Sequence, residues 1–217
     1  MMRRAALVPL ALAAVAALRC GSTGPGTVVV SGTGADDYYV ADAQGNTALT
    51  GSHKTNTPTE LPAGSYVVVL NGSRAPARIR AGRRTDVVAG NLVVSGTGAD
   101  DYYVADSLGG RALTGSRRTN TATELLPGTY TVVLNGSQQR VTLTGGTTTE
   151  AAAGNLLVRG TGADDYYVAD SLGGRALTGS RRTNTATELL PGTYAVRLRD
   201  RSFTVQVRPG DSSVVRP

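Results

Sequence analysis

The chain has little of what large globular domains use to build a core. Its 217 residues include no tryptophan, one phenylalanine, one cysteine and one histidine, whereas glycine occurs 28 times. Without large aromatic side chains, one extensive core is unfavourable, and several small cores of β-branched residues are favoured instead. A lone cysteine excludes an intramolecular disulfide, and a lone histidine argues against zinc sites and histidine-based triads.

The charge of the chain is modest once its start is set aside. The formal net charge is +6, but Arg3, Arg4 and Arg19 belong to the N-terminal leader, and without them 19 basic residues face 16 acidic ones. Such a small excess does not indicate a nucleic-acid-binding surface. We therefore expect no nucleic-acid partner.

Residues 1–20 are typical of a secretory signal peptide. Arg3 and Arg4 form a basic start, and an apolar stretch of 14 residues follows from Ala5 to Leu18. Because a membrane-spanning helix needs about 20 apolar residues, this stretch is too short to span comfortably. The sequence predicts a signal-peptide helix and an exported protein of the cell envelope, either anchored only at its start or secreted or periplasmic.

Cys20 ends the leader and is followed by the Gly/Ser-rich segment 21–25. This arrangement resembles a bacterial lipoprotein signal, in which the cysteine becomes the lipidated first residue and a flexible tether follows. The sequence departs from that pattern because Arg19, instead of a small residue, precedes the cysteine. The alternative is ordinary cleavage after Ala16 or Ala17. If lipidated, the chain would contact the membrane through the anchor only, and stable anchoring would need more than one acyl chain.

The rest of the chain is a threefold repeat. The string GADDYYVAD begins at Gly34, Gly98 and Gly162, a spacing of 64 residues. Gapless alignment gives modules 26–89, 90–153 and 154–217, and residues 96–130 and 160–194 are identical over 35 positions. That identity indicates recent duplication, so agreement between the second and third modules says little about which residues are needed. No linker separates the modules, which favours a stiff rod.

The third module shows which side chains face inward. In TYAVRLRDRSFTVQVRPG, apolar and polar residues alternate with the period of two that is typical of half-buried strands. Asn71-Gly72 and Asn135-Gly136 favour tight hairpins between these strands. The inward positions of the three modules are predicted to be Tyr66, Val68, Leu70, Ala77 and Ile79; Tyr130, Val132, Leu134, Val141 and Leu143; and Tyr194, Val196, Leu198, Phe203, Val205 and Val207.

Each module is therefore predicted to contain six or seven short strands, giving an all-β chain of three small sandwiches. Three sequence elements recur in order: an opening strand, a YxVxDxxG segment (YYVADAQG at 38–45), and an LPxGxY-type turn into the next strand, which reads LPAGSY at 61–66 and LLPGTY in the other two modules. This order resembles the extracellular β-modules of the bacterial PEGA type and the carboxypeptidase-regulatory-like (transthyretin-like) type. The resemblance implies β-sandwich accessory modules without catalytic residues.

The sequence offers no convincing catalytic constellation. His53 is replaced by Arg117 and Arg181 in the other modules. The recurring aspartates do not have the spacing of a calcium loop, and we interpret them as turn and solvated-edge residues instead of as metal ligands or acid–base pairs. These aspartates are Asp36, Asp37 and Asp42; Asp100, Asp101 and Asp106; and Asp164, Asp165 and Asp170. We expect no enzyme activity, metal, cofactor or small-molecule substrate.

A pair of basic residues recurs in one loop position of every module. The pairs are His53 and Lys54, Arg117 and Arg118, and Arg181 and Arg182. Repeated on a rod, they would present a multivalent surface to an anionic envelope polymer or an acidic protein. Alternatively, they balance the neighbouring aspartates or keep the rod soluble, as most charged runs do. The sequence thus favours a structural spacer of the bacterial cell envelope, with a multivalent adhesin or glycan-binding protein as the alternative.

Overall fold

The computed structural model describes residues 24–162 and 164–217. The predicted signal peptide, Cys20 and tether residues 21–23 lie outside the described residues. Pro25, which the sequence assigned to the tether, is instead the first residue of a strand, because it pairs with Pro62. No helix among the described residues is long and apolar enough to cross a membrane.

The described residues form 21 strands, seven in each module. The strands of module 1 are β1 (Pro25–Ser31), β2 (Asp37–Ala41), β3 (His53–Lys54), β4 (Thr59–Pro62), β5 (Gly64–Leu70), β6 (Ser73–Ile79) and β7 (Arg84–Val88). Those of module 2 are β8 (Gly90–Ser95), β9 (Asp101–Ala105), β10 (Arg117–Arg118), β11 (Ala122–Leu125), β12 (Gly128–Leu134), β13 (Ser137–Leu143) and β14 (Thr148–Ala152). Those of module 3 are β15 (Gly154–Val158), β16 (Asp165–Ala169), β17 (Arg181–Arg182), β18 (Ala186–Leu189), β19 (Gly192–Leu198), β20 (Arg201–Val207) and β21 (Ser212–Val215).

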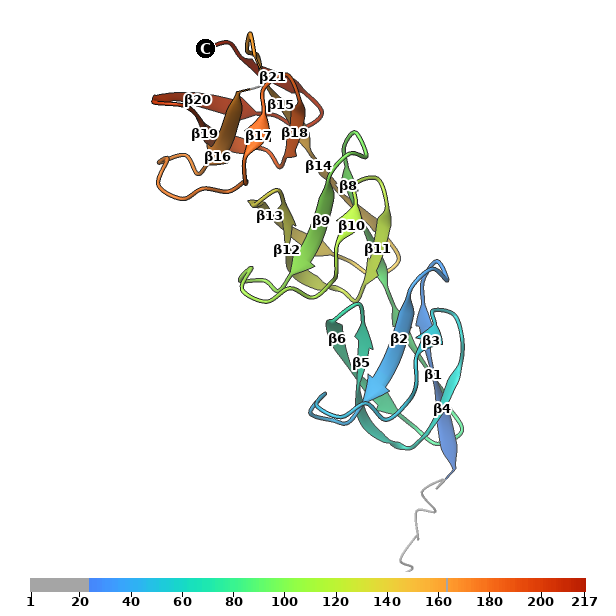
Figure 1. Ribbon diagram of the computed structural model, residues 1–217. Coiled ribbons are helices and arrows are strands. Elements are labelled where there is room, and N and C mark those ends of the chain that lie inside the picture. Colours follow the sequence, from blue (N-terminus) through green and yellow to red (C-terminus); the bar gives the residue numbers. More distant parts are fainter. Residues whose placement is uncertain (1–23, 163) are drawn as a thin grey trace, which may run out of the picture.

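Every module has the same pair of sheets. In module 1 a three-stranded sheet has the order β4-β1-β7, and a four-stranded sheet has the order β3-β2-β5-β6. Strand β1 runs antiparallel to β4 and parallel to β7, whereas all pairs in the four-stranded sheet are antiparallel. The predicted fold class, three tandem β-sandwiches, is confirmed (Figure 1).

The predicted alternation of inward and outward side chains is also observed. Tyr130, Val132, Leu134, Val141 and Leu143 are all buried in the core of module 2. The predicted inward residues of modules 1 and 3 belong to their own cores in the same way, with Tyr66, Phe203 and Val205 only half-buried. Three core clusters therefore exist, one in each sandwich, as expected for small modules.

Tight turns follow the sequence signals. Asn71 and Gly72 adopt φ values of 47° and 75°, the left-handed region that asparagine and glycine tolerate best. Asp42 folds the loop after β2 by accepting the backbone N–H groups of Gln44, Asn46 and Thr47. These hydrogen bonds, led by that from Asn46, hold the pKa of the Asp42 carboxyl below its ordinary value.

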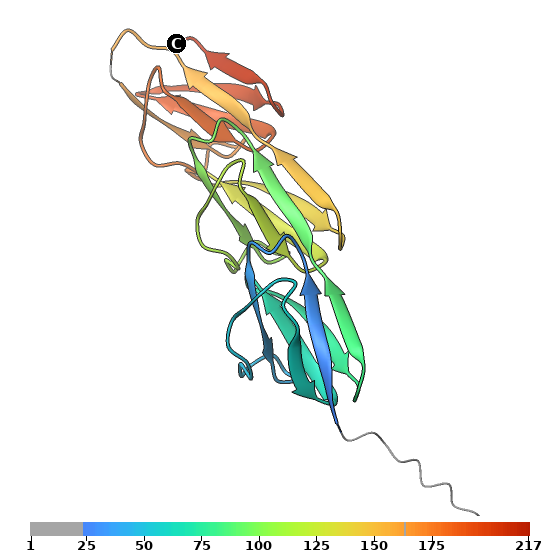
Figure 2. The same ribbon diagram turned by 90° about the vertical axis from the view of Figure 1, so that its right-hand side faces the viewer.

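The modules follow one another along a single axis (Figure 2). Only Ala89 separates β7 from β8, and only Ala153 separates β14 from β15. Both alanines are buried at 5% exposure, and each belongs to the core of the module that it ends. The connection therefore forms part of the packed structure.

One buried tyrosine in each sandwich gives a test of the core. The Tyr102 hydroxyl donates to the Thr121 carbonyl at 2.9 Å and lies 2.8 Å from Thr123 Oγ1. We expect Tyr102→Phe to lower the free energy of unfolding of module 2 by about 1–3 kcal/mol, because it leaves buried polar atoms without a partner. Hydrogen exchange of the core amides of module 2 measures this loss. Tyr103→Phe, on the exposed face, is the matched control and should change nothing.

Candidate functional site

The basic pairs of the sequence lie on three two-residue strands, β3, β10 and β17. Each of these strands forms the edge of its four-stranded sheet, next to β2, β9 and β16 respectively. Because adjacent residues of a strand point to opposite faces, the two members of a pair separate. The side chain of Arg118 is 68% exposed, whereas that of Arg117 is 31% exposed. The two residues of each pair thus face different surroundings.

The outward members are Lys54, Arg118 and Arg182. The ammonium group of Lys54 lies 3.0 Å from Oδ1 of Asp37, and Nε of Arg118 lies 3.9 Å from Oδ1 of Asp101. Both pairs are well exposed, so they contribute little to stability. They also place a negative charge beside each of these two outward cations.

The inward members Arg117 and Arg181 reach across to the preceding module. Nη2 of Arg117 lies 3.2 Å from Oδ1 of Asp36 and donates to the side-chain carbonyl of Asn71 at 3.1 Å. Arg181 repeats this arrangement with Asp100, at 3.7 Å, and Asn135. Each of the two module junctions therefore uses the inward arginine of the following module's basic pair, a contact that the sequence alone did not reveal.

This contact corrects the interpretation of Asp36 and Asp100 as solvated-edge residues. Their side chains are only 12% and 16% exposed. Each is covered because the next module docks against the loop that carries it. His53 occupies the corresponding position in module 1, where no module precedes it among the described residues, and its ring lies 5.8 Å from that of Tyr38.

A buried glutamate lies at the centre of the first junction. Glu124 of module 2 is 1% exposed and inserts its carboxylate into a loop of module 1. Oε2 accepts the backbone N–H of Asp36 at 3.1 Å and the hydroxyl of Thr55 at 3.0 Å, while Oε1 accepts the N–H of Thr33. We call this set of donors, on residues 33, 36 and 55, the carboxylate socket.

The main chain of the glutamate is held as well. Its N–H donates to Oδ2 of Asp36 at 3.0 Å, and its carbonyl accepts the side-chain amide of Asn71 at 2.9 Å. Asp36 thus bridges two groups of the incoming module, with Oδ1 facing Arg117 and Oδ2 facing the glutamate backbone. The glutamate is therefore recognised as part of an extended strand.

The second junction repeats the first. Glu188 is 2% exposed and accepts hydrogen bonds from the N–H of Thr97, the N–H of Asp100 and the hydroxyl of Thr119. Its own N–H donates to Oδ2 of Asp100, and Asn135 donates to its carbonyl. The same contacts thus join modules 1 and 2 and modules 2 and 3.

The second residue after each glutamate is a leucine whose side chain enters the core of the preceding module. Leu126 is fully buried within the core of module 1, and Leu190 within that of module 2. The N–H of Leu126 donates to the hydroxyl of Ser73 at 2.9 Å. Next to that serine, Gly72 lies so close that a Cβ there would be 2.6 Å from the carbonyl oxygen of Leu113. Polar and apolar contacts together hold the two modules in one orientation.

Sequence reasoning missed the junction glutamates, although a signal was present. Glu60, Glu124 and Glu188 occupy the same position of the repeat, but the next two residues read Leu-Pro in module 1 and Leu-Leu in modules 2 and 3. Likewise, the hairpin reads Asn-Gly-Ser at 71–73 and 135–137 but Arg-Asp-Arg at 199–201. The modules differ at the positions that face a neighbour.

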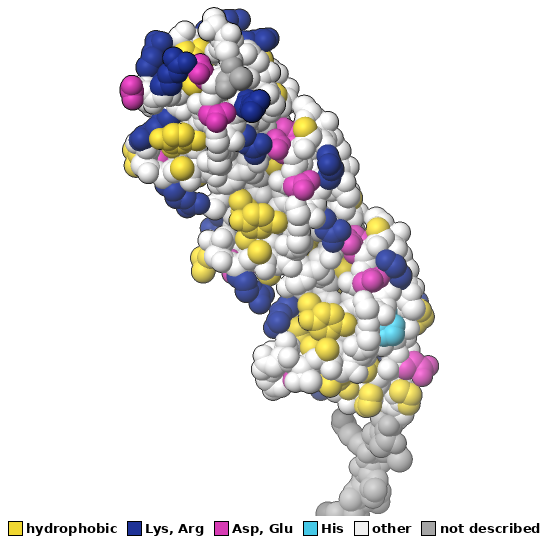
Figure 3. Space-filling model, in the orientation of Figure 1, with side chains coloured by type: hydrophobic (Ala, Val, Ile, Leu, Met, Phe, Trp, Pro, Cys, Tyr) yellow, Lys and Arg dark blue, Asp and Glu magenta, His cyan; other side chains and the backbone are white. Residues whose placement is uncertain are grey.

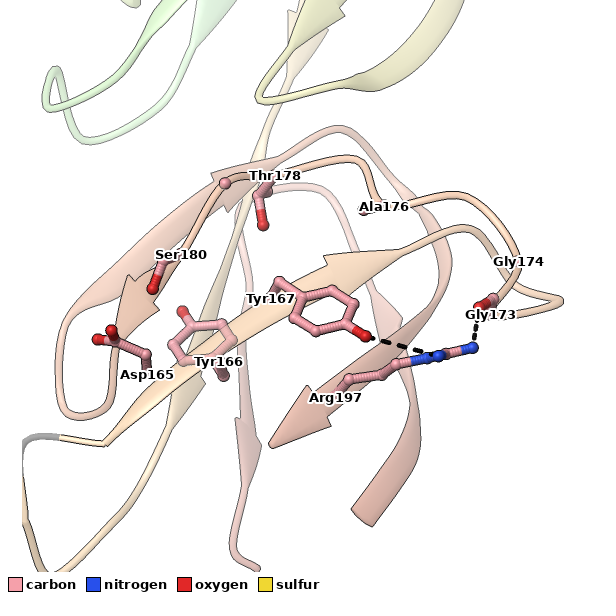
Figure 4. Close-up of a pocket in the computed structure, with 10 residues that line it drawn as sticks. Asp165, Tyr166, Tyr167, Gly173, Gly174, Ala176, Thr178, Ser180 and Arg197 are labelled. Atoms are coloured by element: carbon pink, nitrogen blue, oxygen red, sulfur yellow. Dashed lines mark hydrogen bonds between the residues drawn. The ribbon is translucent and has the colours of Figure 1, made fainter. Parts of the chain in front are cut away.

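A second surface feature lies on the outer face of the four-stranded sheet of module 3. Tyr167 is 37% exposed and its ring lies 6.0 Å from the guanidinium of Arg197, which also donates to the carbonyl of Gly173 (Figure 4). These residues line an open pocket of about 370 Å³ together with Asp165 and Ser180. Val69 and Val133 replace Arg197 in the other modules, so the arginine of this pocket is specific to module 3.

The arrangement holds the modules together through engaged carboxylates and buried leucines. Among residues 24–162 and 164–217, no three histidine, aspartate, glutamate or cysteine side chains gather as metal ligands. The carboxylates at the junctions are engaged by backbone and hydroxyl donors, as in a structural anion site. The geometry supports recognition and rigidity.

Comparison with known proteins gives no family. No family model matches the sequence. No curated protein matches it either.

Similar solved structures include the Bacillus anthracis TIE protein, at 14% identity and a TM-score of 0.24. Another is the pilus adhesin SpaC from Lactobacillus rhamnosus GG in its open conformation, at 11% identity and a TM-score of 0.21. The alignments cover 90% of this chain but only 50% and 43% of those chains, so the chain spans half their length or less. At these TM-scores the likeness carries no argument about function.

The buried glutamate predicts how the first junction responds to substitution. Glu124→Gln replaces an acceptor oxygen with an NH₂ group that faces backbone N–H donors. We expect the docking of modules 1 and 2 to lose about 1.5–3 kcal/mol, the usual contribution of a hydrogen bond to a charged group. Hydrogen exchange at the amides of Thr33 and Asp36 measures the change.

Glu60→Gln is the matched control, since Glu60 occupies the same position in module 1 and is exposed. It should leave exchange at both amides unchanged. Equal protection in Glu124→Gln and the unsubstituted chain would contradict the structural role of the carboxylate.

Proposed function

We propose that this protein is an exported, non-catalytic spacer of the bacterial cell envelope, built as a rod of three docked sandwiches. The observation that carries the proposal is the repetition of one specific junction. Both junctions bury a glutamate carboxylate against the same three donors and a leucine in the preceding core. A chain selected only for separate modules would not need a desolvated carboxylate at each connection.

Export and anchoring are supported by the sequence of the leader. A basic start, a short apolar stretch and a cysteine at position 20 together favour a lipidated N-terminus. In that arrangement module 1 lies nearest the membrane and module 3 farthest from it. The rod then holds the far end of module 3 at a fixed distance from the membrane.

The resemblance to PEGA-type and carboxypeptidase-regulatory-like modules belongs to the same proposal. Its motifs occupy structural positions here: the YxVxDxxG segment forms a core strand and the turn after it, and the LPxGxY segment leads into the central hairpin. Accessory modules of this type support a spacer role and bring no catalytic residue.

Rod stiffness can be measured directly. Spin labels on Gln44→Cys and Leu108→Cys, two exposed residues in the same position of modules 1 and 2, report the distance between them. With Cys20 replaced by serine, we expect one narrow distance distribution in pulsed electron paramagnetic resonance. Adding Glu124→Gln should broaden it, because the modules then rock at the weakened junction. An equally broad distribution in both chains would overturn the spacer proposal.

The second candidate, a multivalent adhesin or glycan-binding protein, is favoured by one observation. Lys54, Arg118 and Arg182 are exposed and recur once in each module. If these residues bind an anionic envelope polymer, replacing all three with serine should abolish retention on polyglucuronate-coated beads at low salt. We expect retention to change less than twofold, because at least two of the three cations already face an aspartate.

The matched control for that experiment removes three exposed charges elsewhere, through Arg74→Ser, Arg140→Ser and Arg208→Ser. Loss of binding in both triple variants would reflect net charge alone. Loss confined to the Lys54, Arg118 and Arg182 variant would establish the adhesin function.

A further inference from the structure

Module 3 carries the residues of a third carboxylate socket, and no glutamate of the described residues occupies it. Thr161, Asp164 and Thr183 occupy the positions of Thr33, Asp36 and Thr55. An open pocket of about 450 Å³ lies there, lined by Thr161, Asp164 and Asn184 among others. The Thr183 hydroxyl, whose counterparts donate to Glu124 and Glu188, donates instead to the carbonyl of Gly162 at 2.8 Å.

In this socket, the arginine that pairs with the aspartate comes from module 3 itself. At the two junctions the arginine that faces Oδ1 of the socket aspartate arrives with the next module. In module 3 that arginine is Arg199, which stands in the hairpin position of Asn71 and lies 2.6 Å from Oδ1 of Asp164. Arg199 lies outside the stretch that is identical between modules 2 and 3, so simple duplication does not account for it.

The second carboxylate oxygen of Asp164 keeps its place as an acceptor. At the junctions, Oδ2 of the socket aspartate accepts the main-chain N–H of the incoming glutamate. The Arg199 contact is to Oδ1, and no hydrogen bond to Oδ2 of Asp164 is present among the described residues. The socket therefore keeps an acceptor for the backbone of an arriving strand, and the Thr183 hydroxyl would donate to its side chain after turning away from the carbonyl of Gly162.

The surroundings of this socket are strongly basic. Arg159, Arg199, Arg201 and Arg216 all line the pocket and are exposed. Figure 3 shows arginine side chains, in dark blue, gathered at this end of module 3. A cluster of arginines around hydrogen-bond donors attracts anions at a distance and pairs with carboxylates on contact.

Another module of this chain does not fit the same place. At each junction a glycine lets a leucine of the incoming module approach closely. A Cβ at Gly72 would be 2.6 Å from the carbonyl oxygen of Leu113, and one at Gly136 would be 2.3 Å from that of Leu177. Asp200 takes this position in module 3 and Arg201 takes that of Ser73. At the opposite end of the rod, Pro62 replaces the leucine whose N–H binds that serine, and proline has no N–H to donate.

We propose that the far end of module 3 binds a glutamate-bearing extended segment of a different polypeptide. The glutamate carboxylate would accept the N–H groups of Thr161 and Asp164 and the hydroxyl of Thr183, and its main-chain N–H would donate to Oδ2 of Asp164. The arginines would attract neighbouring acidic residues of the same segment. The far end of module 3 would thus be a recognition site made from the elements of a module junction, a function that goes beyond spacing.

A peptide pair tests the proposal. The probe is the acetylated and amidated peptide Ala-Thr-Glu-Leu-Leu-Pro-Gly, which copies residues 122–128, and its control carries Gln in place of Glu. Added to the three-module chain labelled with ¹⁵N, the Glu peptide should shift the amide resonances of Thr161, Asp164 and Thr183 in a saturable way. We expect the Gln peptide to bind about 10-fold or more weakly, the effect of losing one hydrogen bond to a charged group.

Variants of the chain complete the test. Thr183→Val removes one donor and should weaken binding of the Glu peptide about 10-fold or more, whereas Thr185→Val, at an exposed position nearby, should not. Arg201→Ser should reduce both the affinity and its dependence on salt. Equal binding of the two peptides, or shifts that are unchanged in Thr183→Val, would overturn the proposal. Concentration-dependent dimers that form through module 3 would overturn it too, since the occupant would then be a second copy of this chain. These readouts do not depend on the stiffness of the rod.

Discussion

The structure depends on a carboxylate buried where two modules meet. Removing an ionised group from water costs several kcal/mol unless it is paired and hydrogen-bonded. Glu124 and Glu188 meet that requirement through donors that only the correctly docked neighbour presents. A slightly rotated module would leave the charge unsatisfied, so the carboxylate penalises other orientations more than it stabilises the observed one. Leu126 and Leu190, two residues after these glutamates, add apolar burial to the same contact.

This constraint changes how the charged surface is understood. One arginine of each repeated pair is used at a junction in modules 2 and 3, where it compensates Asp36 or Asp100. Only the other member faces solvent, and in module 2 it stands beside an aspartate of its own module. The structure therefore leaves fewer free cations along the rod than the sequence suggested. Conversely, four arginines of module 3 line one pocket at its far end, which no periodicity in the sequence had indicated.

The divergence between modules follows their position along the rod. The hairpin that contacts the next module at both junctions reads Asn-Gly-Ser in modules 1 and 2, and the same positions of module 3 read Arg-Asp-Arg. The position whose side chain enters the preceding core is leucine in modules 2 and 3 and proline in module 1. Recent duplication leaves most other positions uninformative. These changes alter residues whose counterparts make contacts at the two junctions.

The amino-acid sequence determined the all-β class, the 64-residue repeat and the inward face of each hairpin, because strand periodicity and turn chemistry are local properties that neighbouring residues encode. Only the tertiary structure decided that Asp36 is buried, that Arg117 and Arg118 have separate roles, and that Glu124 holds a junction. The junction contacts of Arg117 and Glu124 join residues 46 to 91 positions apart. Such pairs are brought together by the docking of whole modules, and docking depends on surfaces that are assembled from several strands.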